Sequence, residues 1–336
     1  MSDFDGRLKG RDFLGLEDFS TEELELLLAL AAEMKAGRDG RPYIEGKGIG
    51  LIFTVPSTRT RISFQSAARQ LGGSAEVYSP AELQLANGET LIDTAEVMGR
   101  LLDAIVIRTY DVSHYGKGRE FLRTMADHAA VPVINALDDK EHPCQVLADV
   151  LTFKERFPDD FRQRKLVFSW AYATRQKSMG VTHSILVAAG LLGLNMTMVF
   201  PPGFEPDEEY AAFGREAAAR SGARLELSHD LDAACEGADA IYAKSWKSLS
   251  SSAEEDRELR RQLRDQWCIS ERHFAAAHPG ALFMDPMPLV RGEEATAEVV
   301  DGPRSVRYHQ AENRLHVQKA LLACLLGDAG ELARAT

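Results

Sequence analysis

Cysteine is scarce in this 336-residue sequence, which contains four, and no two of them form a Cys-x-x-Cys pair. They stand at positions 144, 235, 268 and 324. Cysteines so few and so scattered exclude a disulfide framework and do not have the spacing of a zinc site. The pattern favours reduced thiols in a cytoplasmic protein.

The sequence also has no long apolar run and fewer basic than acidic residues. The first twenty residues contain no apolar core of signal-peptide length, and no run is long enough to span a bilayer. Lys and Arg number 39 against 51 Asp and Glu, a net charge of −12. This excess of negative charge argues against broad binding to nucleic acid or to a membrane surface. An anionic ligand would have to be held by a few local arginines.

Several signatures of common enzyme classes are absent. The sequence has no Walker loop, no G-x-G-x-x-G, no H-E-x-x-H and no defensible Ser-His-Asp spacing. The turn after the predicted strand 165–170 reads AYATRQKS, without the glycines that let a backbone approach a pyrophosphate. A nucleotide-dependent dehydrogenase is therefore disfavoured.

The residues that are present predict an α/β protein with two parallel sheets, because apolar strands alternate with helices along the chain. Strands are expected at 48–55, 74–79, 103–109, 131–136, 165–170, 195–200, 223–228, 239–246 and 281–288. Helices are expected at 20–37, 59–71, 89–102, 116–129, 142–158, 181–193, 207–221, 230–237, 270–277 and 312–326. The polar stretch 247–267 is expected to be a mobile loop.

A chain of this length fits two domains of ordinary size. The turn at Pro158–Asp160 separates two similar strand–helix patterns. We expect two doubly wound parallel-sheet domains with a cleft between them. The first would comprise residues 1–150 plus a closing C-terminal helix, 312–330, that returns to it, and the second residues 151–311.

Residues 53–64 read FTVPSTRTRISF, an apolar strand followed by a hydroxyl- and arginine-rich turn and the start of a helix. Free N–H groups and the positive end of a helix dipole attract anions. Arg59 can pair with two oxygens of one phosphate. The segment therefore predicts a phosphate site, although a surface helix with a capping serine and solvated arginines fits the local pattern equally well.

Ligands of open α/β sheets collect beyond the carboxyl ends of the strands. The segments at those ends are Ser57–Arg61, Arg108, His142–Gln145, Trp170–Gly180, Lys244–Trp246 and Asp285–Pro288. We expect the first three to face the last three across the cleft. Taken singly, each has an ordinary structural explanation: His142 as a helix cap, Cys144 as core packing and Arg108 as a surface ion pair.

Taken together, these stretches resemble the aspartate/ornithine carbamoyltransferase family over nearly the whole chain. The resemblance is carried, in the family's order, by STRTR at 57–61, NGETLIDTA at 87–95, Arg108, HPCQ at 142–145 and QAENR at 310–314. It implies a transferase that moves the carbamoyl group of carbamoyl phosphate to an amine and releases phosphate. It also implies a homotrimer whose subunits share active sites, in amino-acid biosynthesis such as the arginine pathway.

The resemblance implies roles for individual residues in binding carbamoyl phosphate. Arg108, His142 and Thr60 would surround the carbonyl oxygen, which becomes an oxyanion when the amine attacks. The phosphate would be held by Ser57, Thr58, Arg59, Thr60 and Arg314, the carbamoyl amino group by Gln145, and Gln84 would enter from a neighbouring subunit. No metal, cofactor or covalent intermediate is implied, because the departing phosphate can accept the amine's proton.

The second half is most similar to the N-acetylornithine/N-succinylornithine branch of the family, whose second domain contains a knotted loop. Trp170-Ala171-Tyr172 resembles the W-x-Y strand end of that branch, and residues 243–246 match its A-K-S-W, in which the lysine helps to bind the amino acid. Residues 173–178 depart from its proline-rich loop. Its acidic acyl-contact position falls at Asp138, its modified lysine at Glu294, and Leu91 matches neither its acetyl nor its succinyl type.

The amine pocket would then include Asp138, Trp170, Lys244, Asp285, Pro286, Met287, Arg291 and Glu294. Asp285 would attract and deprotonate the amine, or it is a structural turn residue. Lys244 and Arg291 would each meet the substrate's carboxylate. The implied substrate is an ornithine-like diamino acid: N-acetylornithine first, then free ornithine, then a shorter diamino acid. A catalytically silent binding protein with this fold is the rival hypothesis.

Overall fold

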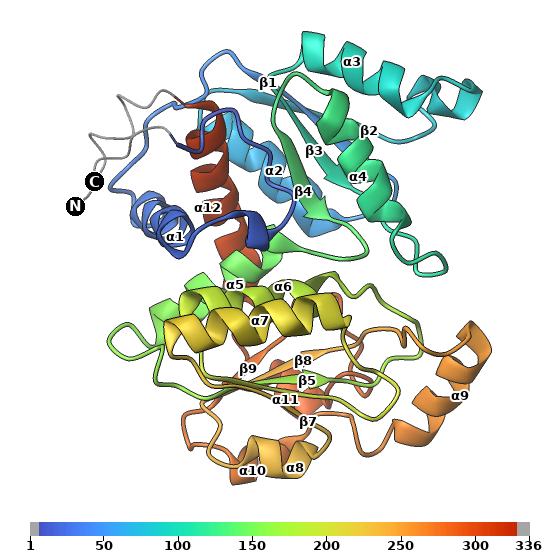
Figure 1. Ribbon diagram of the computed structural model, residues 1–336. Helices are drawn as coiled ribbons and strands as arrows, with labels where there is room; N and C mark the ends of the chain where they lie inside the picture. The colour runs from blue at the N-terminus through green and yellow to red at the C-terminus, as the bar shows by residue number, and fades with distance from the viewer. Residues whose placement is uncertain (1–6, 328–336) are drawn as a thin grey trace. The chain divides into compact units, whose positions relative to one another are not determined.

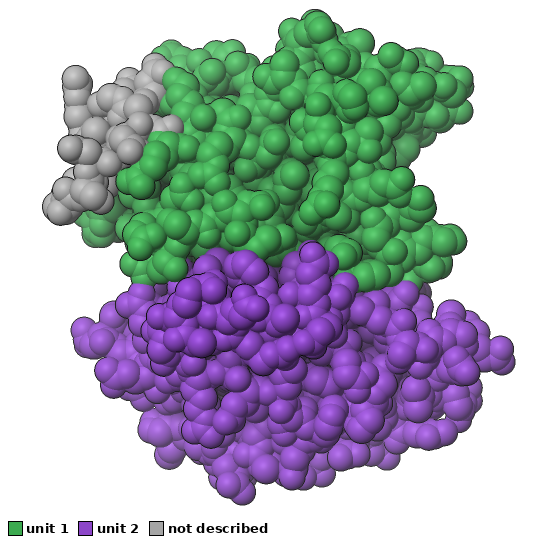
Figure 2. All heavy atoms as spheres, in the orientation of Figure 1, with its two compact units in different colours: residues 1–148, 312–336 green, residues 149–311 purple. Residues whose placement is uncertain are grey.

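The computed structural model describes residues 7–327 (Figure 1). It divides into two compact units, one formed by Met1–Ala148 with Glu312–Thr336 and the other by Asp149–Ala311 (Figure 2). Both limits fall inside helices, α5 (Pro143–Arg156) and α12 (Arg307–Leu326). Residues 328–330 of the predicted closing segment lie outside the described residues.

The first unit is built on a four-stranded parallel sheet in the order β2-β1-β3-β4. Its strands are β1 (Gly48–Phe53), β2 (Ser74–Tyr78), β3 (Ala104–Arg108) and β4 (Val133–Leu137). With α5 and α12, its helices are α1 (Thr21–Lys35), α2 (Thr58–Gln70), α3 (Leu91–Leu101), α4 (Lys117–His128) and the 3₁₀ turns Leu16–Asp18 and Gln84–Asn87. β1, β3 and β4 are buried almost throughout, as internal parallel strands are, whereas edge strand β2 is partly exposed.

The second unit has a five-stranded parallel sheet in the order β7-β6-β5-β8-β9. Its strands are β5 (Leu166–Trp170), β6 (Met196–Val199), β7 (Leu225–Ser228), β8 (Ala240–Lys244) and β9 (Leu282–Met284). Its helices are α6 (Gly180–Leu192), α7 (Glu208–Ser221), α8 (Leu231–Cys235), α9 (Ala253–Leu263), α10 (Glu271–Ala276) and α11 (Ala297–Asp301). Helices α6 and α7 lie side by side (Figure 1). Gly190 permits their close approach, because a Cβ at this position would come within 2.6 Å of the Gly214 carbonyl oxygen.

Each sheet has one point at which the strand order reverses. In the first unit, the chain moves outward from β1 to β2 and in the opposite direction from β3 to β4, so the reversal lies between β1 and β3. In the second unit it lies between β5 and β8, whose last residues, Trp170 and Lys244, are register partners. Such reversals open a crevice at the carboxyl ends of the strands, where ligands bind.

The predicted fold class is confirmed: both sheets are parallel and helix-flanked, and α12 returns to the first unit. The prediction of a mobile loop at 247–267 is wrong, because residues 253–263 form α9 with a capping box between Ser252 and Glu255. The helix is anchored by Arg260, which pairs with Asp256 inside α9 and donates to the Ser245 hydroxyl at 2.8 Å and to the Trp246 carbonyl oxygen. Asp256 and Arg260 are buried, whereas the other charged side chains of α9 are exposed.

Other differences concern the ends of elements. β9 ends at Met284, so Asp285–Pro288 form a loop and not the end of a strand. α12 begins at Arg307, five residues before the predicted start, and α11 is a helix that the sequence pattern did not indicate. Among residues 7–327, none of the helices combines the length and the apolar character needed to cross a membrane.

Candidate active site

The N-terminus of α2 follows β1 at the reversal point of the first sheet. Ser57 caps the helix by accepting a hydrogen bond from the Thr60 N–H at 3.2 Å. The first turn contains no acidic residue, whereas α1, α7 and α9 each carry two or three there. Because a carboxylate would occupy the positive end of the helix dipole, its absence leaves that end able to receive an external anion.

Arg108 ends β3 beside this helix start. It is the register partner of Phe53, and its carbonyl oxygen accepts from the Thr54 N–H at 3.0 Å. Burial lowers the pKa of the Arg108 guanidinium to about 10; the Tyr110 side chain opposes the shift and the positive charge of Arg59 adds to it. Its Nε is buried and finds no hydrogen-bond partner within residues 7–327. Two neighbouring cations of this kind are stabilised by a shared anion.

Arg314 of α12 connects three separate segments of the first unit. Its Nη2 donates to Thr60 Oγ1 at 2.7 Å and its Nη1 donates to Gln145 Oε1 at 3.0 Å. All three side chains are buried. Gln145 lies in the first turn of α5, three residues after the buried His142, whose carbonyl oxygen accepts from the Gln145 N–H at 3.1 Å. The structure thus brings together residues of α2, α5 and α12 that the sequence predicted for carbamoyl phosphate.

A depression of about 640 Å³ opens beside the start of α2. It is lined by Ser57 and Thr58 on one side and by Pro80 and Glu82, from the segment after β2, on the other. Gln84 follows in that segment, is exposed, and accepts a hydrogen bond from Asn87 Nδ2 at 2.9 Å. Its predicted contribution to a neighbouring subunit stays a prediction.

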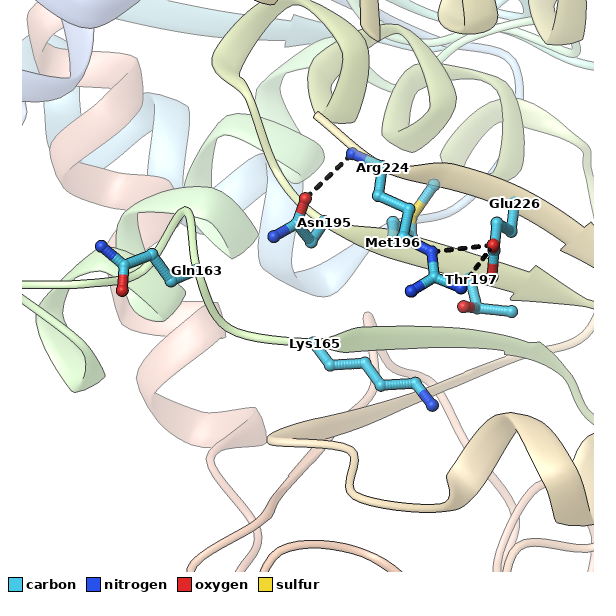
Figure 3. Close-up of a pocket in the computed structure, with 7 residues that line it drawn as sticks. All are labelled: Gln163, Lys165, Asn195, Met196, Thr197, Arg224 and Glu226. Atoms are coloured by element: carbon cyan, nitrogen blue, oxygen red, sulfur yellow. Dashed lines mark hydrogen bonds and ion pairs between the residues drawn. The ribbon is translucent and has the colours of Figure 1, made fainter. Parts of the chain in front are cut away.

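A second depression, of about 210 Å³, lies at the amino ends of three strands of the second sheet (Figure 3). Lys165, Asn195 and Arg224, which line it, stand just before β5, β6 and β7 respectively. Figure 3 shows Arg224 turned toward Glu226, with which it forms an ion pair at 2.7 Å. Because it opens at the amino ends of the strands, this depression is not where the fold places catalysis.

At the carboxyl end of β8, Lys244 is nearly enclosed, with 7% of its surface exposed. Its Nζ donates to the carbonyl oxygens of Ser178, at 3.2 Å, and Ser245. Burial lowers the pKa of Lys244 to about 7; the charge of Lys177 adds to this shift, and Asp285 and Glu294 oppose it.

Asp285 follows β9 and is also buried. Its carboxylate accepts from the Met287 N–H, and its own N–H donates to Gln310 Oε1 at 3.0 Å. Burial raises the pKa of Asp285 to about 7; the positive charge of Lys177 opposes this shift, and the negative charge of Glu294 adds to it. A carboxyl group that titrates near neutrality is suited to accept a proton from an ammonium.

Glu294 completes the group and has no exposed surface. Its Oε2 accepts from the Val290 N–H at 2.8 Å, and its Oε1 forms an ion pair with Lys177. The electrostatic influence of Lys177 on both Lys244 and Asp285 links the four side chains into one cluster, which we call the charged cluster. The sequence indicated Lys244, Asp285 and Glu294 but missed Lys177.

Three other predicted amine-pocket residues are held by structural contacts. Trp170 is fully buried and donates from Nε1 to the Trp246 carbonyl oxygen at 3.0 Å. Arg291 is half exposed and pairs through two nitrogens with Asp301, each at 2.6 Å. Asp138, in the first unit, is fully buried and accepts from Arg119 and from the Lys140 N–H at 2.9 Å.

The remaining predicted positions lie in loops or against the core. Pro286 and Met287 belong to the loop after β9, in which Met287 has a φ of 46°. Leu91 is the first residue of α3 and packs against the apolar core of the first unit. Within residues 7–327, no three His, Cys, Asp or Glu side chains group together in a way that would hold a metal ion.

Comparison with known proteins decides the family. Residues 11–155 match the carbamoyl-P binding domain of aspartate/ornithine carbamoyltransferase, and residues 168–325 match the Asp/Orn binding domain. The chain belongs to the aspartate/ornithine carbamoyltransferase family. It is a carbamoyltransferase, as the resemblance of its motifs implied.

The similar sequences are named for ornithine, whereas the similar structures are named for acetylornithine or for ornithine. The chain is 42% identical to the ornithine carbamoyltransferase of Symbiobacterium thermophilum, over 95% of this chain and 99% of that protein. It is 41% identical to that of Pyrococcus abyssi, over 95% and 97%.

Among solved structures, acetylornithine transcarbamylase complexed with acetylcitrulline superposes with a TM-score of 0.88 at 36% identity, over 95% of this chain and 100% of that one. Ornithine carbamoyltransferase from Pyrococcus furiosus gives a TM-score of 0.85 at 39% identity, over 95% and 98%. The carbamoyltransferase thus has close relatives of both substrate types.

Lys177 is the residue of the carbamoyltransferase's charged cluster that sequence reasoning did not find. It lies in the loop between β5 and α6, where the sequence departs from the proline-rich loop of the N-acylornithine branch. That departure was the available signal. Its partner, Glu294, is 117 positions away, so the pair itself is visible only in the folded chain.

Proposed function

We propose that this carbamoyltransferase transfers the carbamoyl group of carbamoyl phosphate to the primary amine of an ornithine-like diamino acid, with N-acetylornithine as the favoured substrate. The observation that carries the proposal is the buried contact of Arg314 with both Thr60 and Gln145 beside the carboxylate-free start of α2. It assembles donors of the kind that a small phosphorylated carbonyl compound requires.

The first unit's residues would act on carbamoyl phosphate. The phosphate would lie at the start of α2, held by backbone N–H groups, by the hydroxyls of Ser57 and Thr58, and by Arg59. Arg108, His142 and Thr60 would donate to the carbonyl oxygen, and Gln145 would orient the carbamoyl amino group. Arg314 would hold the side chains of Thr60 and Gln145 in position.

The chemical step would then need no covalent enzyme intermediate. The lone pair of the amine nitrogen attacks the carbonyl carbon, and the oxygen becomes an oxyanion beside the guanidinium of Arg108. The new C–N bond remains as the bond from carbon to the phosphate oxygen breaks. Phosphate leaves with the bonding electrons and accepts the proton lost by the nitrogen.

The second unit's charged cluster would receive the amine substrate. Lys244 would bind its carboxylate, and Asp285 would attract the reacting ammonium and take its proton. The pKa of Asp285, raised to about 7 by burial, supports this role because the group can exchange a proton near neutral pH. The contacts of Arg291 and Asp138 with Asp301 and Arg119 favour structural roles for those two residues.

Free ornithine is the second candidate substrate. It is favoured by the names of similar sequences, which include ornithine carbamoyltransferases at 38–42% identity. N-acetylornithine is favoured by the acetylornithine transcarbamylase structures and by the A-K-S-W sequence that ends in Trp246.

Assembly and location are part of the same proposal. We propose a homotrimer in which the segment around Gln84, exposed in the single chain, completes a neighbouring active site. The sequence-based expectation of a cytoplasmic enzyme of arginine biosynthesis stays a prediction.

The test is an assay of phosphate release and product mass with carbamoyl phosphate and a panel of amines. The panel is ornithine, N-acetylornithine, N-succinylornithine, putrescine, aspartate and 2,3-diaminopropionate. We expect the highest kcat/KM with N-acetylornithine. Highest activity with aspartate, putrescine or the shorter diamino acid would overturn the amine assignment, and absence of amine-dependent phosphate release would favour a binding protein.

A further inference from the structure

The ion pair between Lys177 and Glu294 is part of the charged cluster, to which the proposed function assigns the amine substrate. Glu294 is completely enclosed, and both of its carboxylate oxygens are occupied, one by Lys177 Nζ and the other by the Val290 N–H. Lys177 also donates to the Pro288 carbonyl oxygen at 2.8 Å. The pair therefore joins the loop after β5 to the loop after β9, and it neutralises a buried carboxylate.

The four charged groups of the cluster are not equally available to a substrate. It contains two cations, Lys177 and Lys244, and two carboxyl groups, Asp285 and Glu294. Lys177 and Glu294 satisfy each other, so the groups left for a substrate are Lys244 and Asp285. On the proposed function, Lys244 meets the carboxylate of the amino acid and Asp285 meets the reacting amine.

We propose that Lys177 is a specificity-determining residue: by occupying Glu294 it leaves no carboxylate for a free α-ammonium group, so the pocket prefers an amino acid whose α-nitrogen is acylated. This inference rests on the proposed function. A buried ammonium without a partner is strongly disfavoured, whereas an acylated nitrogen carries no charge and needs only a hydrogen-bond acceptor. Free ornithine has one positive charge more than the cluster can pair, and N-acetylornithine does not.

The competing explanation is that the Lys177–Glu294 pair only fastens two loops together. The chain contains a natural control for that explanation. Thr174, in the same loop, donates to Glu293 through its hydroxyl at 2.6 Å and through its N–H at 3.0 Å. This contact joins the same two segments, but it is exposed and changes no charge of the cluster.

The test compares kcat/KM for N-acetylornithine and for ornithine in matched variants. Lys177→Met keeps the length of the side chain and removes its charge, which leaves Glu294 able to pair with an α-ammonium. We expect the ratio of kcat/KM for N-acetylornithine over ornithine to fall at least about tenfold, chiefly through a lower KM for ornithine. Lys177→Arg should preserve the ratio, and Thr174→Val should lower both activities by the same factor or neither.

A second variant keeps the test decisive if Lys177→Met folds poorly. Lys177→Met combined with Glu294→Gln removes both charges and should return the ratio toward the wild-type value. An unchanged ratio in Lys177→Met, or a ratio change as large in Thr174→Val, would overturn the role of Lys177 while leaving the proposed function intact. A wild-type enzyme that carbamoylates neither acid would overturn both.

Discussion

The side chain of Arg314 donates a hydrogen bond of 2.7 Å to the hydroxyl of Thr60, which lies 254 positions earlier in the chain. The same guanidinium donates to Gln145 at 3.0 Å. Helix α12 therefore completes a candidate site that begins just after β1. A site assembled from three distant segments depends on the whole fold of its unit, because no single segment holds its donors in place.

Replacing this guanidinium should affect both activity and stability. Arg314→Met leaves the buried Thr60 hydroxyl and Gln145 amide without their charged donor. We expect kcat/KM for carbamoyl phosphate to fall at least 100-fold and the free energy of unfolding to fall by about 3 kcal/mol. Enzyme assays and urea denaturation measure the two effects, and near-normal values of both would contradict the assigned contacts.

Arg59 and Arg61 form a matched pair of arginines in the first turns of α2. Arg59 is half-buried and acts electrostatically on Arg108, whereas Arg61 is exposed. We expect Arg59→Ala to lower kcat/KM at least 100-fold while the circular dichroism spectrum and melting temperature stay close to wild type. Arg61→Ala is the control and should keep most of its activity. Equal losses in the two variants would argue against a phosphate contact at position 59.

The pKa of Asp285 predicts how stability changes with pH. Burial raises it from 3.8 to about 7, so the folded state binds a proton that the unfolded state releases above pH 4. The stabilisation from this proton is fully present below about pH 4 and is lost as the pH rises through about 7. Lys244, with its pKa lowered to about 7, stays largely protonated in both states below that pH.

Asp285→Asn should remove that pH dependence, because the amide imitates the neutral acid. Between pH 5 and pH 7 the wild-type free energy of unfolding should fall by about 2 kcal/mol more than that of the variant. Urea denaturation at a series of pH values measures the difference. Parallel stability curves for the two proteins would show that Asp285 is ionised in the folded state throughout this range.

A shared active site can be tested by mixing inactive subunits. If Gln84 acts in a neighbouring site, mixed trimers of Arg59→Ala and Gln84→Ala chains contain some sites with neither substitution. Joint refolding of the two variants should restore up to about a quarter of wild-type activity, since one site in four would be intact in a random mixture of equal parts. Failure of the mixture to exceed either variant alone would count against sharing.

Sequence patterns indicated two segments of the first unit's candidate site, because each stands at or just after the end of a predicted strand. Ser57–Thr60 follow β1 and Arg108 ends β3, so the strand pattern alone places them at one edge of the sheet. The contact of Arg314 with Thr60, in contrast, depends on how α12 packs on α2 and is not encoded in any local pattern. The family resemblance implied a role for Arg314 with the phosphate, but not this contact.

The second unit was harder to predict because buried charges imitate surface composition. In α9 only Arg260 and Asp256 are buried among the charged residues, and a segment this polar reads as a solvated loop unless the burial of that pair is known. Trp170, a residue expected to touch the substrate, is enclosed by Trp246 and Trp267. Lys177 finds Glu294 across 117 positions, a contact set by the packing of two loops.

The most direct test of the account is a crystal structure with a bisubstrate phosphonate that joins a carbamoyl phosphate mimic to an ornithine-like acid. The account predicts phosphonate density at the N-terminus of α2, within hydrogen-bond distance of the Arg59 guanidinium and of the Ser57 and Thr58 hydroxyls. It also predicts the ligand's carboxylate beside Lys244. Phosphonate density away from Arg59 would contradict the account.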